Sequence, residues 1–226
     1  MGSAATNVTA AAAITSINPA TGEVLGEVPV MTAEQVRAAV ETARAAQREW
    51  ARVPVEARCR RVAKFADVLM ARADEVIEVL VREGGKTRQE ALGMELVVVA
   101  DLVRYFAKHA PEMLAPEPIA LHLMKHRASY LHFTPRGIVG VIAPWNFPFS
   151  IPVGETMMAL IAGNGVVLKP SEVTPLIALK ARELYLAADL PPELFQIVTG
   201  RGPTGAALID SGIDYCVFTG SVATGK

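Results

Sequence analysis

Apolar residues in the first half of the chain recur every three or four positions, which is the spacing of one face of an α-helix. Two capping boxes mark where such helices begin, because a Thr is followed three residues later by Gln or Glu: Thr32 with Gln35, and Thr87 with Glu90. The second helix is long and is predicted to run to about His109. The first half of the chain is therefore predicted to be mostly helical.

Another helix is predicted to begin at Pro54, because proline is tolerated in the first turn, where its missing N–H would have no partner. Phe65 and Leu69 lie on the apolar face of this helix. A further helix is expected to end at Gly84. Four basic side chains are expected to form the solvated side of the helix that begins at Pro54: Arg58, Arg60, Arg61 and Lys64.

The start of the chain shows little patterning. Residues 1–16 are rich in Ala and Thr and are predicted to be a disordered tail, with order beginning near Ile17. Residues 18–22 (Asn-Pro-Ala-Thr-Gly) are turn-forming, and alternating apolar positions follow in residues 24–30. This combination predicts a small hairpin.

The helical region is broken by Pro116 and Pro118, after which the spacing changes to that of β-strands. We predict that residues 119–136 form a projecting β-hairpin used for subunit contact. Four residues are expected to line one face of its strands: Leu121, Leu123, Leu131 and Phe133. A metal site is not predicted, because no Cys, Asp or Glu lies close to the three histidines of this segment: His122, His126 and His132.

Short apolar runs alternate with helical patterns in the second half. Strands are predicted at residues 137–143, 166–168, 195–198 and 215–218. Helices are predicted between them, at 150–162, from Thr174 onward, and at 203–209. Such alternation implies a parallel sheet with helices on both faces. The predicted fold is therefore α/β: a doubly wound parallel sheet preceded by a helical segment and a projecting hairpin.

Composition narrows the class of protein. The 226 residues include 22 Lys+Arg and 23 Asp+Glu, for a formal net charge of -1, which argues against a nucleic-acid binder. Hydrophobic residues make up 51 %, but no apolar run reaches the roughly 18 residues of a transmembrane helix. The two cysteines, Cys59 and Cys216, do not form a disulfide framework, and Cys216 is expected to be a small buried hydrophobe. We predict a soluble, cytoplasmic protein with no membrane partner.

Polar, Gly and Pro residues follow each predicted strand, and the carboxyl ends of parallel strands meet at one edge of a sheet. The segments are Pro144–Asn146, Lys169–Glu172, Thr199–Gly202 and Thr219–Ser221. A cation, an acid, an amide and glycine-rich backbone suit a nucleotide, because glycines let the backbone approach phosphates and an acid can bind ribose hydroxyls. A nucleotide site is predicted at this edge.

At these residues the chain resembles the aldehyde dehydrogenase superfamily. Pro-Trp-Asn-Phe-Pro at 144–148, Lys-Pro-Ser-Glu at 169–172 and Phe-Thr-Gly-Ser at 218–221 occur in the family's order and at compatible spacing. The resemblance covers residues 17–226. It implies a Rossmann-like NAD-binding domain formed by residues 17–118 and 137–226, and an oligomerisation hairpin at 119–136.

The resemblance also implies roles for individual residues. Asn146 corresponds to the family's catalytic amide, which donates a hydrogen bond to the oxyanion formed when a thiolate attacks the aldehyde. Lys169 and Glu172 correspond to the pair that holds the adenosine ribose, and Glu172 would repel a 2′-phosphate, so NAD is favoured over NADP. Other residues correspond to parts of the cofactor cleft: Ile142, Trp145 and Phe218 to its lining, Gly220 and Ser221 to the turn near the phosphates, and Gly202 to a glycine near the adenine.

The family's nucleophilic cysteine and glutamate base lie beyond the segment that matches Ser221, and Cys216 comes too early to replace the nucleophile. The catalytic domain is thus expected to be absent, and this chain alone to be a truncated, inactive form. The full-length form would oxidise a small-molecule aldehyde, whose identity the sequence leaves open, and would be a homo-oligomer.

Two alternatives stay open. A non-catalytic short form could bind a nucleotide or a subunit of the full enzyme. In addition, residues 220–226 match the first seven positions of a phosphate-binding loop, GxxxxGK, which would indicate a nucleotide triphosphatase.

Overall fold

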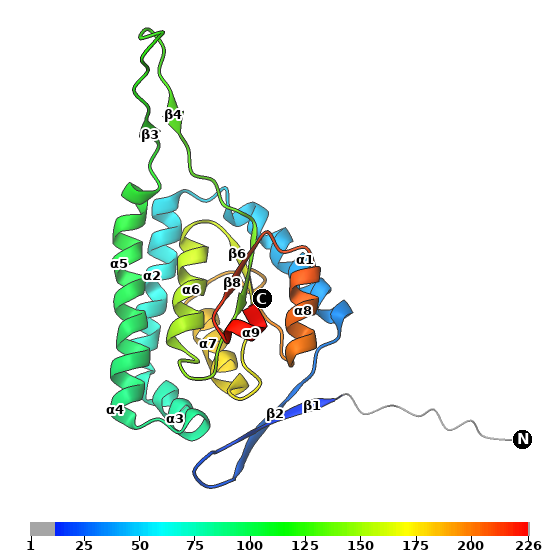
Figure 1. Cartoon of the computed structure of the whole chain (residues 1–226). Coiled ribbons are helices and arrows are strands. Elements are labelled where there is room, and N and C mark those ends of the chain that lie inside the picture. Colours follow the sequence, from blue (N-terminus) through cyan, green and yellow to red (C-terminus); the bar gives the residue numbers. More distant parts are fainter. Residues whose placement is uncertain (1–11, 226) are drawn as a thin grey trace, which may run out of the picture.

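The computed structural model describes residues 12–225 of the chain (Figure 1). A parallel sheet lies at the centre, with helices packed against both of its faces and a thin hairpin projecting from one end. The first half contributes β1 (Ala13–Ile17), β2 (Val24–Pro29), α1 (Ala33–Trp50), α2 (Val55–Ala71), α3 (Ala73–Gly84), α4 (Arg88–Glu90), the π-helical segment η1 (Ala91–Leu96) and α5 (Val97–Met113). The second half contributes β3 (Glu117–Pro118), β4 (Tyr130–Leu131), β5 (Ile138–Ile142), α6 (Ser150–Ile161), β6 (Gly165–Lys169), α7 (Pro175–Ala187), β7 (Phe195–Ile197), α8 (Gly202–Asp210), β8 (Tyr215–Phe218) and α9 (Val222–Gly225).

The four central strands form a parallel sheet in the order β7-β6-β5-β8. Val139 of β5 pairs with Val166 on one side and with Tyr215 on the other. The chain thus adds β6 and β7 outward from β5 and then crosses back to place β8 on the opposite side of β5. This order confirms the doubly wound parallel sheet predicted from the alternation of strands and helices.

Buried side chains fill the space on both faces of the sheet. In β6, Val166 and Leu168 face a large core that includes α6 and α7, whereas Val167 faces a smaller core with α1 and α8. On the side of α6, helices α2 and α5 form a further layer (Figure 1). Strands covered on both faces are apolar at every position, which explains the continuous apolar runs in the sequence.

Both predicted capping boxes are present, at Thr32 and at Thr87. The helical region after Thr87 runs further than predicted, to Met113 instead of about His109. Pro111 lies inside this last turn, where it has no N–H to donate to the carbonyl four residues earlier. The π-helical turn at Ala91–Leu96 was not predicted.

The start of the chain differs from the prediction of a disordered tail over residues 1–16. Residues 1–11 lie outside the described part, but β1 begins at Ala13 and pairs antiparallel with β2. Ile14 of β1 and Val28 of β2 are buried, and the Ser16 hydroxyl donates to Glu83 at 2.7 Å. This segment is ordered because its alternate side chains pack against the body, although its sequence is rich in Ala and Thr.

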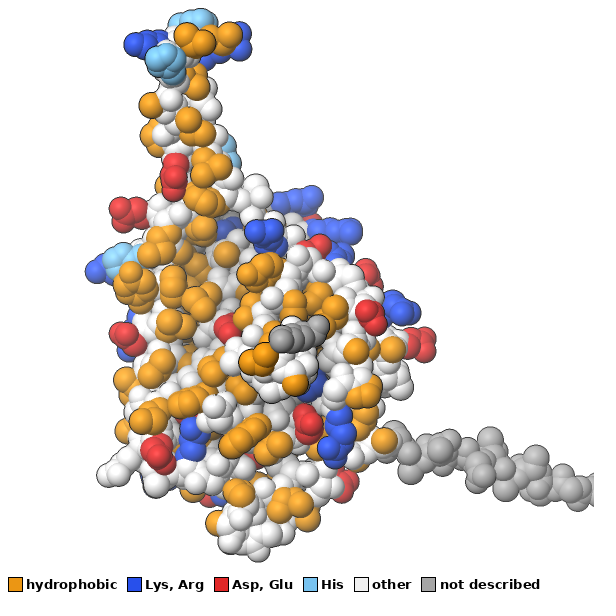
Figure 2. Space-filling model, viewed as in Figure 1, with side chains coloured by type: hydrophobic (Ala, Val, Ile, Leu, Met, Phe, Trp, Pro, Cys, Tyr) orange, Lys and Arg blue, Asp and Glu red, His pale blue; other side chains and the backbone are white. Residues whose placement is uncertain are grey.

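A hairpin projects from the body, but its strands are short, and β3 (Glu117–Pro118) lies before the predicted bounds of 119–136. Pairing is limited to Glu117 with Leu131 and Pro118 with Tyr130, and the Arg127 N–H donates to the Met124 carbonyl at the tip. The four residues expected to form one strand face do not line a continuous ladder: Leu121, Leu123, Leu131 and Phe133. In Figure 2 the hairpin stands clear of the body and exposes apolar side chains along its length.

The carboxyl end of α6 is held by side chains from α1 and α2. Trp50 Nε1 donates to the Leu160 carbonyl at 2.7 Å, Gln47 Nε2 to the Gly163 carbonyl at 3.0 Å, and Arg58 Nε to the Ile161 carbonyl at 2.9 Å. The prediction that Arg58 is solvated is therefore wrong. Its guanidinium is buried because it satisfies carbonyl groups that water does not reach.

The amino end of α7 is held in a similar way by Glu83 of α3. Its carboxylate accepts from the backbone N–H groups of Leu176 at 2.9 Å and Ile177 at 2.8 Å, as well as from the Ser16 hydroxyl. Burial raises the pKa of the Glu83 carboxyl, and these three hydrogen bonds partly offset the rise.

In residues 12–225, no helix has an apolar stretch long enough to cross a membrane.

We expect Glu83→Ala to lower the free energy of unfolding by about 3 kcal/mol, because it leaves buried N–H donors without an acceptor, at about 1–3 kcal/mol for each group. Urea denaturation measures this loss. Glu78→Ala is the matched control, since Glu78 is an exposed residue of the same helix. A loss no larger than that of the control would show that water replaces the carboxylate.

Candidate functional site

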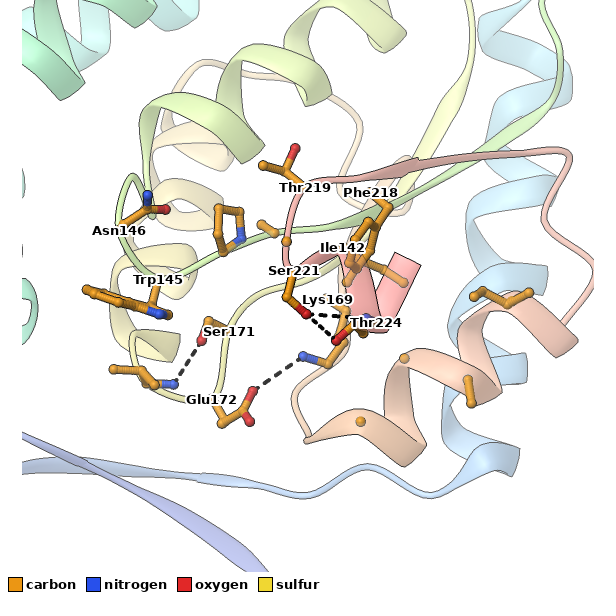
Figure 3. Close-up of a pocket in the computed structure, with 18 residues that line it drawn as sticks. Ile142, Trp145, Asn146, Lys169, Ser171, Glu172, Phe218, Thr219, Ser221 and Thr224 are labelled. Carbon is orange, nitrogen blue, oxygen red and sulfur yellow. Dashed lines mark hydrogen bonds and ion pairs between the residues drawn. The ribbon is translucent and has the colours of Figure 1, made fainter. Parts of the chain in front are cut away.

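A cleft of about 820 Å³ opens at the carboxyl ends of the parallel strands (Figure 3). It lies where β5 and β8 end side by side, which is the switch point at which the strand order reverses. Open α/β sheets bind ligands at such points, because the loops after neighbouring strands diverge there. The structure brings together all nine residues predicted for the site: Ile142, Trp145, Asn146, Lys169, Glu172, Gly202, Phe218, Gly220 and Ser221.

Asn146 lies in the turn between β5 and α6, at one end of the cleft (Figure 3). Its Oδ1 accepts from the Phe147 N–H at 3.1 Å, so the orientation of the amide is fixed by its own turn. An amide held through its oxygen presents its NH2 group as a hydrogen-bond donor. Trp145, the preceding residue, is 60 % exposed and forms a wall of the cleft.

Lys169 ends β6 and is only 5 % exposed, although its side chain lines the cleft. Its Nζ donates to the Pro170 carbonyl at 2.9 Å and lies 3.8 Å from Glu172 Oε2. Burial lowers the pKa of the Lys169 ammonium, and the nearby Glu172 carboxylate partly offsets this. The pair places a donor and an acceptor side by side, which suits a ligand that carries vicinal hydroxyl groups.

Small residues of α8 form another wall. Gly202 opens the helix, and a Cβ there would meet nothing within 4 Å, so the space beside it is open to a ligand. Gly205 lies one turn further along, where a Cβ would lie 3.4 Å from Lys169 Cδ. A larger side chain at Gly205 would therefore press on the buried lysine.

The segment after β8 closes the cleft on the side opposite Asn146 (Figure 3). Gly220 is needed there, because a Cβ at this position would lie 2.6 Å from Phe218 Cζ. Ser221 Oγ accepts from the Thr224 N–H at 3.2 Å and forms a hydrogen bond with Thr224 Oγ1 at 2.9 Å. These bonds shape the short turn of α9.

Sequence reasoning named the residues directly after each strand and missed those on helix faces and in the longer loops. Gly205 and Ile209 of α8 lie four positions apart and so face the cleft from one side of the helix. That spacing was a usable signal. The lining residues that were missed are Ala143, Val173, Gly205, Ala206, Ile209 and Thr224.

Cys216 is exposed, which corrects the expectation of a buried thiol. It lies in β8, an edge strand of the four-stranded sheet, so neighbouring parts of the chain cover it less than they cover the inner strands. Although the residue is exposed overall, partial burial raises the pKa of the Cys216 thiol, and the Glu155 carboxylate raises it further. A thiol with a raised pKa is a weak nucleophile at neutral pH.

Glu155 of α6 forms a side-chain hydrogen bond with Thr219, which lines the cleft. Its Oε2 atom is buried without a hydrogen-bond partner among the described residues. Burial raises the pKa of this carboxyl to about 6, and the bond with Thr219 partly opposes the rise.

In residues 12–225 no group of three or more His, Cys, Asp and Glu side chains is arranged to hold a metal ion.

The aldehyde dehydrogenase family matches residues 7–226 of the chain. A relative from Mycolicibacterium smegmatis, named "Putative succinate-semialdehyde dehydrogenase (NADP(+))", is 40% identical over 206 residues, which are 91% of this chain and 40% of that protein. The chain thus spans about 40% of the length of this curated relative.

Solved structures of aldehyde dehydrogenases are also similar to this chain. The crystal structure of a "Putative Aldehyde Dehydrogenase from Burkholderia cenocepacia" superposes with a TM-score of 0.89 at 33% identity, over 95% of this chain and 44% of that one. An NAD-dependent benzaldehyde dehydrogenase from Corynebacterium glutamicum has a TM-score of 0.86 at 28% identity, over 95% and 47% of the two chains.

The raised pKa of Glu155 leads to a pH-dependent prediction. Between its unfolded value of 4.5 and about 6, the folded protein binds more protons at Glu155 than the unfolded chain does, so stability falls as pH rises through this range. We expect Glu155→Gln to raise Tm by a few degrees at pH 7, with the gain shrinking toward zero below pH 4.5.

Thermal unfolding at a series of pH values measures this gain. Glu78→Gln, at an exposed position, controls for the loss of one negative charge. A gain for Glu155→Gln that does not change with pH would contradict the prediction.

Proposed function

The chain belongs to the aldehyde dehydrogenase family, and on that basis we propose that it is the cofactor-binding part of an enzyme that oxidises an aldehyde to a carboxylic acid with NAD as hydride acceptor. The observation that carries this proposal is the cleft at the switch point of the sheet. It combines a fixed amide donor, Asn146, with a buried cation and an acid, Lys169 and Glu172. Ile142, Trp145 and Phe218 supply its apolar walls.

The residues of the cleft fit a dinucleotide. Lys169 and Glu172 would hold the hydroxyls of the adenosine ribose, and the open space beside Gly202 would admit the adenine end. Gly220 and Ser221 would lie near the phosphates. When bound, NAD supplies the hydride acceptor. Glu172 favours NAD, because a carboxylate at this position repels a 2′-phosphate. The name of the relative from M. smegmatis indicates NADP(+) instead, so NADP is the alternative.

Asn146 would act on the substrate. Its NH2 group would donate to the oxygen of the aldehyde as that oxygen gains negative charge on attack by a thiolate. The thiolate and the general base are not assigned to any residue of this chain, because Cys59 is buried and Cys216 lies in a strand with a raised pKa. We therefore expect these 226 residues alone to produce no NADH from an aldehyde and NAD.

The same proposal assigns a role to each segment of the chain. Residues 17–118 and 137–226 form the cofactor domain, and residues 119–136 form a hairpin for assembly into a homo-oligomer. The apolar side chains that the hairpin exposes support this role, because water-exposed apolar surface of this kind is usual at subunit contacts (Figure 2). The two free cysteines support a reducing, cytoplasmic location.

Isothermal titration of the chain with NAD and NADP tests the cofactor proposal. We expect NAD to bind more tightly than NADP, and Glu172→Gln to reduce this preference by about tenfold, equivalent to about 1.4 kcal/mol, because the mutation removes the charge that repels the 2′-phosphate. Glu193→Gln is the matched control, because Glu193 is exposed and does not line the cleft.

Other outcomes of this titration would contradict the proposal in different ways. Tighter binding of NADP by the wild-type chain would favour the alternative cofactor. Binding of Mg-ATP without binding of either dinucleotide would favour a phosphate-binding loop at residues 220–226, whose Lys226 lies outside the described residues. NAD binding together with steady NADH production by the 226 residues would overturn the expected inactivity.

The role of Asn146 has its own test. In the protein as the cell makes it, Asn146→Ala should lower kcat by about 10²–10³-fold, the usual effect of removing one oxyanion donor, while the Kd for NAD stays unchanged. Asn18→Ala is the control, because Asn18 lies in the turn between β1 and β2. An unchanged kcat for Asn146→Ala would show that the amide does not contact the reacting oxygen.

A further inference from the structure

The turn that carries Asn146 has few hydrogen bonds of its own to fix its conformation. It connects β5 to α6 and contains Pro144 and Pro148, neither of which has an N–H to donate. The bond between Asn146 Oδ1 and the Phe147 N–H fixes the amide relative to its neighbour only. A donor aimed at an oxyanion must be held to within about 0.5 Å, so the turn needs an anchor in the body of the protein.

That anchor is Glu95, a residue of the π-helical segment η1 in the first half of the chain. Its side chain is 0 % exposed. Glu95 Oε2 accepts from the Ser150 N–H at 2.6 Å and from the Phe149 N–H at 3.3 Å. These donors are at the amino end of α6, where the helix dipole favours a negative charge. The carboxylate therefore fixes the point at which the turn becomes helix.

Lys86 extends this anchor toward Asn146. Its Nζ lies 3.1 Å from Glu95 Oε1 and 4.3 Å from the centroid of the Phe147 ring. A cation above an aromatic ring is attracted to its face, and here the Glu95 carboxylate holds that cation in place. Glu95 thus restrains Phe147 through Lys86, and Phe149 and Ser150 directly. Phe147 is the residue immediately after Asn146.

We infer that Glu95 is a positioning residue for Asn146. It makes no contact with the cleft itself and acts through Lys86 and the amino end of α6. The inference rests on the proposed function, because it requires that Asn146 donate to the reacting oxygen. The π-helical geometry of η1 supports it, since such turns are frequent at functional sites.

A double-mutant cycle separates positioning from a role in stability alone. In the protein as the cell makes it, Glu95→Gln should lower kcat by up to about 100-fold, as expected when a catalytic group is misplaced by about 1 Å. In the background of Asn146→Ala, Glu95→Gln should lower kcat no further, because the group that it positions is gone. Lys86→Met should act in the same direction with a smaller effect.

Glu83→Gln is the matched control, because Glu83 is a buried carboxylate that accepts from two N–H groups at the amino end of α7, away from Asn146. Its effect on kcat should be the same with and without Asn146. If Glu95→Gln behaves like this control, or leaves kcat unchanged, the inference is overturned while the proposed function stands. An unchanged kcat for Asn146→Ala would overturn both.

A second measurement does not depend on activity. Hydrogen exchange in the ligand-free protein should become faster at the Phe149 and Ser150 amides in Glu95→Gln and in Lys86→Met, with the amides of α7 unaffected. Fluorescence of Trp145, which lies in the same turn, should shift as well. Unchanged exchange at these two amides would show that Glu95 does not hold the turn, even if a variant loses activity through poor folding.

Discussion

The two ends of α6 impose the constraint on which the rest of the structure depends. This helix is packed between the sheet and an outer layer of helices, so water cannot satisfy the free N–H and carbonyl groups at its ends. Side chains from the first half of the chain satisfy these groups instead. Trp50 and Arg58 bind carbonyls at one end, and Glu95 binds N–H groups at the other. The helical half is therefore more than a cover for the sheet, because it fixes the helix that follows Asn146.

The same arrangement is repeated at α7, where Glu83 occupies the amino end. Both helices follow strands whose ends line the cleft, β5 and β6, and in both a buried carboxylate from the helical half fixes the place where the loop ends and the helix begins. The strand order then brings these two loops beside the one after β8. The cleft is thus shaped by the sheet, which sets the order of the loops, and by the helical half, which sets their ends.

Much of the fold and of the cleft could be predicted from the sequence, because these features depend on residues that are close together in the chain. Strands buried on both faces appear as apolar runs, and the residues directly after them predicted the rim that includes Lys169 and Asn146. The parts that failed depend on distant partners. Arg58 was predicted to be solvated and Glu95 was not singled out, because the backbone groups that they bind are distant in the sequence. Cys216 seemed suited to a core, but only the strand order shows that β8 is at an edge. Likewise, β1 is ordered by pairing with β2, not by its own composition.

The dependence of α6 on earlier residues also has a consequence in time, because a ribosome delivers the chain from its amino end. At a synthesis rate of about 5–20 residues per second, the stretch from Glu95 to Ile161 takes about 3–13 s to emerge. During that interval Arg58 and Glu95 have no carbonyl or N–H groups of α6 to bind, and the apolar faces of α2 and α5 lack the helix that covers them. The nascent helical half therefore exposes apolar surface and unpaired charged groups, and the packing of α6 buries both.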